Sequence, residues 1–149
     1  MKRAWLALSV LLAGCGAAPK QRMIYFFQPV DPVATGRGTS FRHIGKDWVL
    51  ELDIDPGSIR FLLHNQGESP LRILWPVEDG GAQDSGSAAP PGGVVHGSHA
   101  LSPPLLPLHA GDGPDPVGSV IVVRLRLRRI DLDENLLFRY RVVEAHERD

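Results

Sequence analysis

The sequence predicts an all-β protein, folded as a two-sheet antiparallel sandwich of about seven strands with long loops rich in glycine and proline. Residues 48–55 and 121–128 alternate between apolar and polar side chains, which is the pattern of a half-buried strand. The chain holds 16 Gly and 13 Pro among 149 residues and has no long helical periodicity. Because both residues disfavour helix interiors, we expect strands and loops throughout.

Apolar runs bounded by turn residues indicate the strands of the first half. Four segments have this pattern: 23–27, 48–55, 59–65 and 71–75. Pro29 closes the first of them, which favours an edge strand. Residues 34–46 are polar and rich in glycine and predict a loop. A short polar link joins the third and fourth segments, and we therefore expect these two strands to pair as a hairpin.

The middle of the chain predicts mainly irregular structure. Residues 78–93 contain almost no large apolar side chain and predict a mobile loop. Residues 94–96 suggest a short strand. Residues 102–116 carry five prolines and two glycines, and we expect an irregular crossover whose leucines dock on the core. These leucines are Leu105, Leu106 and Leu108.

The last third has the most regular pattern. Alternation over 121–128 resumes over 136–142, after polar residues 131–135. We expect a long antiparallel hairpin with its turn at 131–135. Asp131 to Asn135 also has the alternating oxygen donors of a calcium loop, but Leu136 stands at the sixth position, where that loop needs Gly. The hairpin turn is the better interpretation.

About seven short strands without a helix resemble the immunoglobulin-like sandwich in general architecture. The segment from Ile59 to Trp75 is similar to one in bacterial lipoproteins of unassigned function, where an apolar strand ends in Asn and a small polar turn, and a second strand ends in Trp. This resemblance covers about 17 residues. It implies a sandwich and carries no activity with it.

The beginning of the chain predicts a secretory signal. Lys2 and Arg3 precede an uncharged run over residues 4–14. As a helix this run would reach only about half of the ~30 Å hydrocarbon core, too short to span a membrane. It ends in Leu12-Ala13-Gly14-Cys15, which resembles the bacterial lipobox.

The lipobox resemblance implies a diacylglyceryl group on Cys15 and cleavage just before it. We therefore expect a signal peptide over 1–14, a lipidated tether over 15–22 and a single sandwich domain over 23–149. Two or more acyl chains give stable anchoring where one is marginal. Gly16 after the cysteine favours the outer membrane in a Gram-negative envelope.

Five arginines form the clearest candidate binding surface, which we call the arginine stripe: Arg124, Arg126, Arg128, Arg139 and Arg141. Side chains two apart in a strand share a face, so the expected hairpin gathers all five on one side of a sheet. Like charges across strands are destabilising unless anions lie near. The anion is either an external ligand, such as lipid phosphates or an acidic partner protein, or internal carboxylates. The internal candidates are Glu51, Asp53, Asp55 and Glu144.

Three histidines form a second candidate site. His96, His99 and His109 lie in neighbouring predicted loops and could meet as ligands for Zn²⁺ or Cu²⁺. Their spacing is unspecific, and solvated side chains are the alternative interpretation. No cofactor is expected other than the lipid on Cys15.

Motifs for catalysis are missing from the sequence. It contains no Gly-x-Ser-x-Gly elbow, phosphate loop, dinucleotide fingerprint or His-Glu-x-x-His motif, and we do not expect an enzyme. A net charge of −1 gives no basis for nucleic-acid binding. Cys15 is the only cysteine, which excludes a disulfide within the chain.

Three functions remain open. The first is a lipid-anchored envelope sandwich that binds or scaffolds a partner protein. The second is a carrier of a small ligand or metal, using the loops that bear histidine. The third is an adaptor for anionic envelope polymers, using the arginine stripe.

Overall fold

The computed structural model describes residues 19–31, 34–76, 81–84, 86 and 88–148. All regular elements in this part are β-strands, and none of its segments is a helix that could cross a membrane. The strands described are β1 (Met23–Pro29), β2 (Thr35–Arg37), β3 (Ser40–Ile44), β4 (Trp48–Asp55), β5 (Ser58–Asn65), β6 (Arg72–Pro76), β7 (Ala82–Asp84), β8 (Val94–Ala100), β9 (Val120–Arg129) and β10 (Leu132–Glu147).

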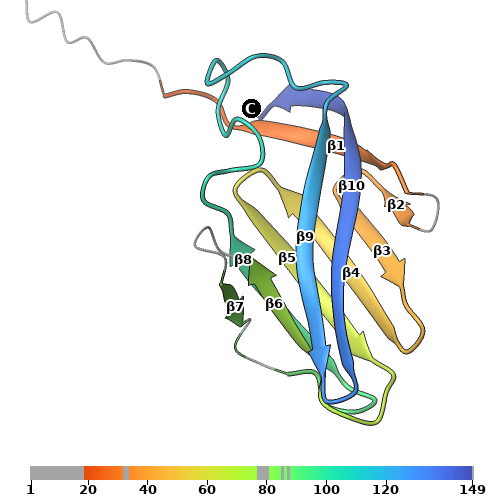
Figure 1. The fold of residues 1–149 in the computed structure, drawn as a ribbon. Coiled ribbons are helices and arrows are strands. Elements are labelled where there is room, and N and C mark those ends of the chain that lie inside the picture. The colour runs from red at the N-terminus through yellow and green to blue at the C-terminus, as the bar shows by residue number, and fades with distance from the viewer. Residues whose placement is uncertain (1–18, 32–33, 77–80, 85, 87, 149) are drawn as a thin grey trace, which may run out of the picture.

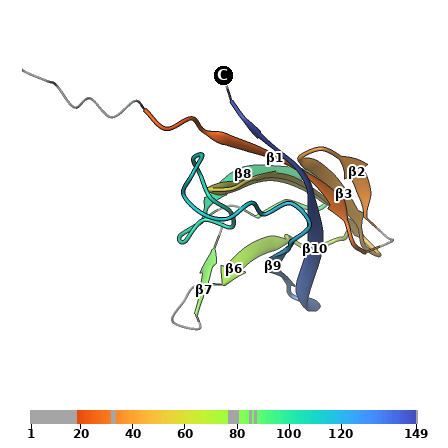
Figure 2. The ribbon, with the colours of Figure 1, turned by 90° about the horizontal axis from the view of Figure 1, so that it is seen from above.

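The strands form two antiparallel five-stranded sheets that pack face to face (Figures 1 and 2). We call the first, with strand order β1-β10-β9-β6-β7, the β9 sheet, and the second, with order β2-β3-β4-β5-β8, the β4 sheet. The predicted all-β sandwich is confirmed. The expected number of about seven strands is wrong, because ten are present among the described residues.

Two of the additional strands lie where a loop was expected, at residues 34–46. β2 and β3 form a short hairpin there, and β3 continues the β4 sheet. Phe41 and His43 face the interior, 2% and 4% exposed, while their neighbours point to solvent. Gly36 has a φ of 142°, a conformation that side chains other than glycine rarely adopt. The sequence did not reveal the alternation in β3, because one of the two inward residues of this strand is a histidine.

The link between β5 and β6 does not form the expected hairpin. β5 pairs with β4 and β8, whereas β6 belongs to the opposite sheet and pairs with β9 and β7. After the link, Leu71 and Ala89 exchange two backbone hydrogen bonds, at 3.0 and 2.8 Å. The segment expected to be a loop at 78–93 therefore includes an ordered part, with Ala89 fully buried.

The long hairpin of β9 and β10 is confirmed, but its turn lies earlier than expected. β9 ends at Arg129 and β10 begins at Leu132, so the turn consists of Ile130 and Asp131. Residues 132–135 already pair with β9. Their polar side chains at Asp133 and Asn135 point outward, which made this part of the strand resemble a turn.

The core fills the space between the sheets. Its fully buried side chains come from both layers and include Tyr25, Leu50, Leu63, Ile73, Leu127 and Tyr140. Burial of one such side chain contributes about 1.5–3 kcal/mol. Two of the three leucines expected to dock on this core from the crossover after β8 do so: Leu106 is 8% exposed, and Leu105 packs against the core. Leu108 is not part of the core cluster. The Tyr25 hydroxyl donates to the Pro107 carbonyl at 2.7 Å.

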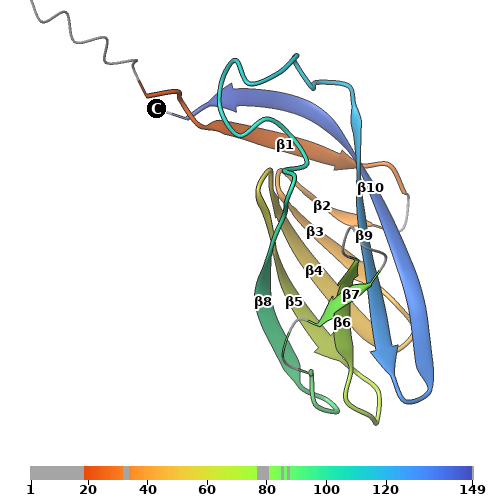
Figure 3. The same ribbon diagram turned by 60° about the vertical axis from the view of Figure 1, so that its left-hand side comes forward.

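The two ends of the described chain lie together. The amide of Arg148 donates to the carbonyl of Arg22 at 2.7 Å, and β1 runs beside the end of β10 (Figure 3). The turn of the β9–β10 hairpin lies at the opposite end of the sandwich (Figure 3). Cys15 and the expected signal peptide lie outside the described residues. The last tether residues contact the domain, since Lys20 pairs with Asp112 at 2.6 Å.

Candidate functional site

The structure brings the five residues of the arginine stripe together on the outer face of the β9 sheet. On β9, the stripe alternates with the buried residues Val123, Leu125 and Leu127. On β10, it alternates with Phe138, Tyr140 and Val142. Each stripe arginine therefore points away from the core. A sixth arginine, Arg72 of β6, is the register partner of Arg128 and joins the same face.

The acidic partners of this face differ from those the sequence suggested. Arg126 and Arg128 share Asp133, with 3.9 Å between the Arg128 Nη2 and Asp133 Oδ2 atoms. Arg139 pairs with Asp31 at 2.8 Å. The partner of Arg72 is Asp84 of β7, at 3.1 Å. Within the described part of the chain, three carboxylates thus accompany six guanidinium groups.

The four carboxylates expected as partners are engaged elsewhere. Three of them belong to strand β4 and pair with arginines outside the stripe. Glu51 pairs with Arg42 at 3.8 Å, Asp53 with Arg60, and Asp55 with Arg22 at 3.0 Å. Glu144 is close to His146, at 3.0 Å. The predicted pairing failed because the acidic strand lies in the opposite sheet, with its carboxylates on the other outer face.

Two of the paired carboxylates, Asp31 and Asp133, have lowered pKa values and stay ionised to lower pH than an ordinary aspartate. The hydrogen bond from Arg126, helped by the charges of Arg126 and Arg128, holds the pKa of Asp133 below its ordinary value. Hydrogen bonds from Arg139 lower the pKa of Asp31 in the same way. The stripe therefore keeps both its positive charges and their few counter-charges at neutral pH.

Arg124 and Arg141 have no acidic partner within the described residues. The residue directly across the hairpin is apolar in each case: Leu137 faces Arg124, and Val120 faces Arg141. These two apolar side chains are 48% and 43% exposed. Val122 stands across from Arg139 in the same arrangement. The outer face is thus mixed, with exposed aliphatic side chains set between guanidinium groups.

A shallow depression lies at one edge of this face. Its volume is about 580 Å³, and Pro76, Ala82, Arg124, Arg126 and Leu137 are among its lining residues. It lies over the strands β6, β7, β9 and β10. Apolar walls and two arginines make this depression suited to a group with an apolar body and a negative charge.

The three candidate histidines do not come together. His96 and His99 lie on the same strand, β8, but an odd spacing puts them on opposite faces of the sheet. His109 lies in the crossover and contacts Asp112, with 3.4 Å between Nδ1 and Oδ2. Nowhere in the described ranges do three His, Cys, Asp or Glu side chains gather as metal ligands would.

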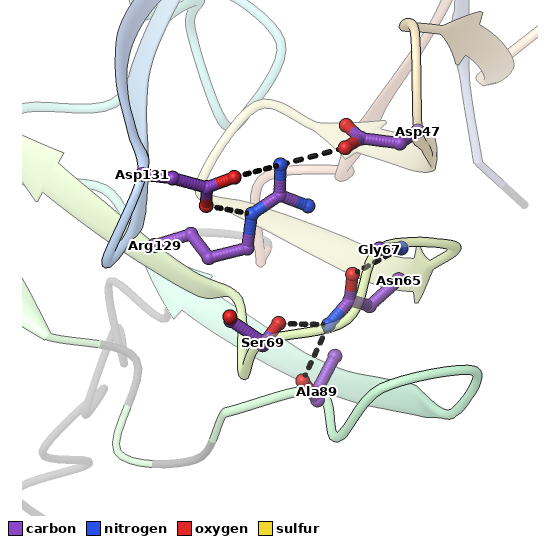
Figure 4. Close-up of polar contacts among 7 residues, drawn as sticks. All are labelled: Asp47, Asn65, Gly67, Ser69, Ala89, Arg129 and Asp131. Carbon is purple, nitrogen blue, oxygen red and sulfur yellow. Dashed lines mark hydrogen bonds and ion pairs between the residues drawn. The ribbon is translucent and has the colours of Figure 1, made fainter.

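A polar cluster at the hairpin end of the sandwich was not expected from the sequence (Figure 4). The Arg129 side chain is 5% exposed and pairs with Asp47 and Asp131, each at 2.6 Å. The hydrogen bonds that Arg129 donates to these two carboxylates, Asp47 first, raise the pKa of Arg129. A Cβ atom on Gly67 would lie 2.0 Å from Arg129 Nη1, so only glycine leaves room for the guanidinium group.

Asn65 completes this cluster beneath Arg129 (Figure 4). It is fully buried, and its amide nitrogen donates to the carbonyls of Ser69 and Ala89, at 2.7 and 3.0 Å. Its side-chain oxygen accepts the amide of Gly67 at 2.9 Å. The cluster fixes the link that carries the chain from one sheet to the other. We assign it a structural role.

A second buried polar pair lies inside the core. His43 Nε2 and the Tyr140 hydroxyl are 2.5 Å apart, and the His43 ring stacks on Phe138 with centroids 3.7 Å apart. Burial lowers the pKa of His43 to about 4, opposed only partly by the charge of Asp31. Burial also raises the pKa of Tyr140. Both groups are neutral at pH 7 and link the two sheets.

The fold and this face define an all-β, two-sheet sandwich that presents a basic and aliphatic surface on its β9 sheet. Comparison of the chain with protein-family models, with curated proteins and with solved structures found no match. The functional argument therefore rests on the residues of the chain itself.

Proposed function

We propose that this chain is a non-enzymatic lipoprotein of the bacterial cell envelope whose sandwich binds a partner protein through the arginine stripe. The observation that carries the proposal is the composition of the stripe. Arg124, Arg139 and Arg141 each face an exposed aliphatic side chain across the hairpin. The stripe holds more positive charge than the carboxylates described beside it balance.

This composition favours a protein partner. Arginine is enriched at protein interfaces, where its long stem packs on apolar groups while the guanidinium group binds carboxylates. The aliphatic side chains Val120, Val122 and Leu137 would bury apolar area against such a partner. The partner would present an acidic surface with apolar side chains between its carboxylates.

An adaptor for anionic envelope polymers is the second candidate, favoured by the surplus of positive charge on the same face. A polymer that offers only anionic groups would bind mainly through charge, and salt would weaken its binding strongly. A protein partner that also covers the aliphatic side chains would bind in a manner that tolerates salt. Binding at low and high ionic strength therefore distinguishes the two.

The anchor proposal rests on the lipobox resemblance of Leu12 to Cys15. A tether from Cys15 would join the domain at the end where β1 begins, and the strands β9 and β10, which carry the stripe, run between that end and the hairpin turn (Figure 3). In this arrangement the stripe would face neighbours in the same envelope layer. The Cys15→Ala variant should leave the membrane fraction and lose the mass of the lipid. Unchanged fractionation and mass would refute the anchor.

The partner proposal is tested by neutralising the two stripe arginines of β10, Arg139 and Arg141, in one double variant to Gln. Their side chains are exposed, so the fold should be preserved. Crosslinking in cells followed by mass spectrometry should recover the partner at a level lower by about tenfold or more. The matched control is Arg42→Gln with Arg60→Gln, on the outer face of the β4 sheet, which should leave recovery unchanged. Equal recovery from both variants would refute the assignment.

A further inference from the structure

A cleft opens where the β9 sheet is incomplete. β9 has ten residues, but β6 has five and pairs only with Arg126, Leu127 and Arg128. Among the described residues, the first half of β9 therefore has a neighbouring strand only on its β10 side (Figure 1). The space beside it, between the ends of the two sheets, is a cleft of about 300 Å³.

Apolar side chains form most of the cleft wall. They come from both sheets and from the crossover after β8: Ile59, Trp75, Leu101, Leu105, Val122 and Val123. The lining is thus assembled from strands β5, β6 and β9 and from a loop. Its volume is at the lower limit of what small-molecule sites in proteins occupy.

Two aromatic rings define one side of the cleft. Trp75 and His99 stack in parallel, with centroids 4.5 Å apart and 3° between the ring planes. Burial lowers the pKa of His99, so its ring is neutral at pH 7. Trp75 is 2% exposed, and its indole Nε1 has no hydrogen-bond partner in the part of the chain described here. A buried donor without an acceptor is costly and rare.

Arg124 is the one charged residue among the described residues that line the cleft. It lines the same cleft as Trp75 and is the stripe arginine on β9 that has no carboxylate partner among the described residues. The cleft thus combines apolar walls, a cation and a buried N–H donor without an acceptor. The indole N–H lacks an acceptor among the described residues, and the cation would attract a negatively charged oxygen.

We propose that this cleft binds a small molecule with an apolar body and one carboxylate group. The carboxylate would accept hydrogen bonds from Arg124, whose planar fork matches its two oxygens, and the indole N–H of Trp75 would donate to an oxygen of the ligand. The apolar body would lie against Leu101, Leu105 and the stacked rings. This site goes beyond the proposed partner binding and does not depend on it.

The test uses the full chain carrying Cys15→Ala, which excludes attached lipid, with ¹⁵N-labelled tryptophan. Sodium octanoate is titrated, and the indole N–H resonances are followed by NMR. The Trp75 resonance, identified by its loss in Trp75→Phe, should shift with saturation, while that of the buried Trp48 should not move. 1-Octanol, which has the same chain length without the charge, should bind at least about tenfold more weakly.

Variants of two arginines on β9 test which of them binds the carboxylate of octanoate. Arg124→Gln should weaken octanoate binding about tenfold or more, whereas Arg128→Gln, on the same strand and face but outside the cleft, should leave it unchanged. No saturable shift of Trp75, equal shifts of Trp48 and Trp75, or equal binding by the Arg124→Gln variant would each overturn the proposal. Partner recovery with the Arg139 and Arg141 variant is a separate readout, so the failure of one proposal is distinguishable from that of the other.

Discussion

The Nη2 atom of Arg129 lies 2.6 Å from the Oδ2 atom of Asp47, and this ion pair joins the end of β9 to the turn between β3 and β4 in the opposite sheet. Because Arg129 is buried and both its carboxylates are partly exposed, the guanidinium group depends on them for its only ionic partners among the described residues. This ion pair links the two sheets at the hairpin end of the sandwich.

Replacement of Arg129 should therefore destabilise the fold. Arg129→Gln leaves Asp47 without its partner and a space where the guanidinium group packed, and we expect a loss of about 2 kcal/mol in the free energy of unfolding. Urea denaturation measures it. Arg128→Gln is the control, since this neighbouring side chain is about half exposed, and it should change stability by less than about 0.5 kcal/mol. Equal effects would contradict the structural role of Arg129.

Gly67 should be intolerant of a side chain for the same reason. Gly67→Ala puts a Cβ atom where Arg129 Nη1 lies, and we expect a loss of about 1–2 kcal/mol. The loss should become smaller in the Arg129→Gln background, because the shorter side chain no longer occupies that space. A double-mutant cycle measures this coupling. Strictly additive effects would show that Gly67 is needed for another reason.

Asn65 should contribute as much to the stability of the fold as a buried apolar residue of the core. Asn65→Ala removes three hydrogen bonds and leaves the carbonyls of Ser69 and Ala89 and the amide of Gly67 without them, so we expect a loss of roughly 3 kcal/mol. Thermal and urea unfolding should agree on this value. The exposed Asn135, changed to Ala, serves as control. A loss below about 1 kcal/mol for the Asn65 variant would mean that water replaces the lost bonds.

Stability should fall in mild acid because of His43. In the unfolded chain its pKa is the ordinary 6.5, whereas burial lowers it to about 4 in the folded state. Below pH 6.5 the unfolded state binds a proton that the folded state does not bind. The stability contributed by neutral His43 is therefore complete above pH 6.5 and is lost as the pH falls toward 4, by about 3 kcal/mol in all.

Urea unfolding at several pH values between 7.5 and 4 tests this dependence. His43→Gln, which keeps a hydrogen-bonding group near Tyr140, should remove most of the slope. A smaller slope should remain, because burial also lowers the pKa of His99. The carboxylates with lowered pKa values, such as Asp31 and Asp133, add to the slope only near the acid end of this window, where their carboxyls begin to be protonated in the unfolded chain. An unchanged slope in the variant would contradict the assignment to His43.

The sequence predicts most of what a local pattern can determine. Alternation in β4, β9 and β10 identifies the buried faces, apart from Val49, which is buried at an outward position of β4. The same alternation places the arginine stripe outside. The strand β3 was missed because polar residues flank its inward Phe41 and its second inward residue is His43. A two-residue period is hard to recognise when a buried polar residue stands at one of the inward positions.

The features that the sequence did not predict depend on contacts between residues distant in the chain. A short polar link after Asn65 is compatible with a hairpin, and only the bonds of Asn65 and Leu71 to Ala89 decide that the chain crosses to the other sheet. The acids of the stripe were misassigned for a related reason. Asp31 and Asp84 come from segments distant in sequence from β9, and no local pattern indicates which sheet they join. The cleft, formed by the unequal lengths of β6 and β9, is equally invisible to periodicity.

Site-specific photo-crosslinking in cells tests the central claim most directly. A photoreactive residue at Val122, between the stripe arginines, should give one discrete protein adduct, whereas the same residue at Leu62, on the outer face of the β4 sheet, should not give it. The adduct should also form when isolated envelopes are irradiated at high salt, and it should decrease strongly when Arg139 and Arg141 are changed to Gln. No protein adduct at Val122, or the same adducts from both positions, would contradict partner binding through the arginine stripe.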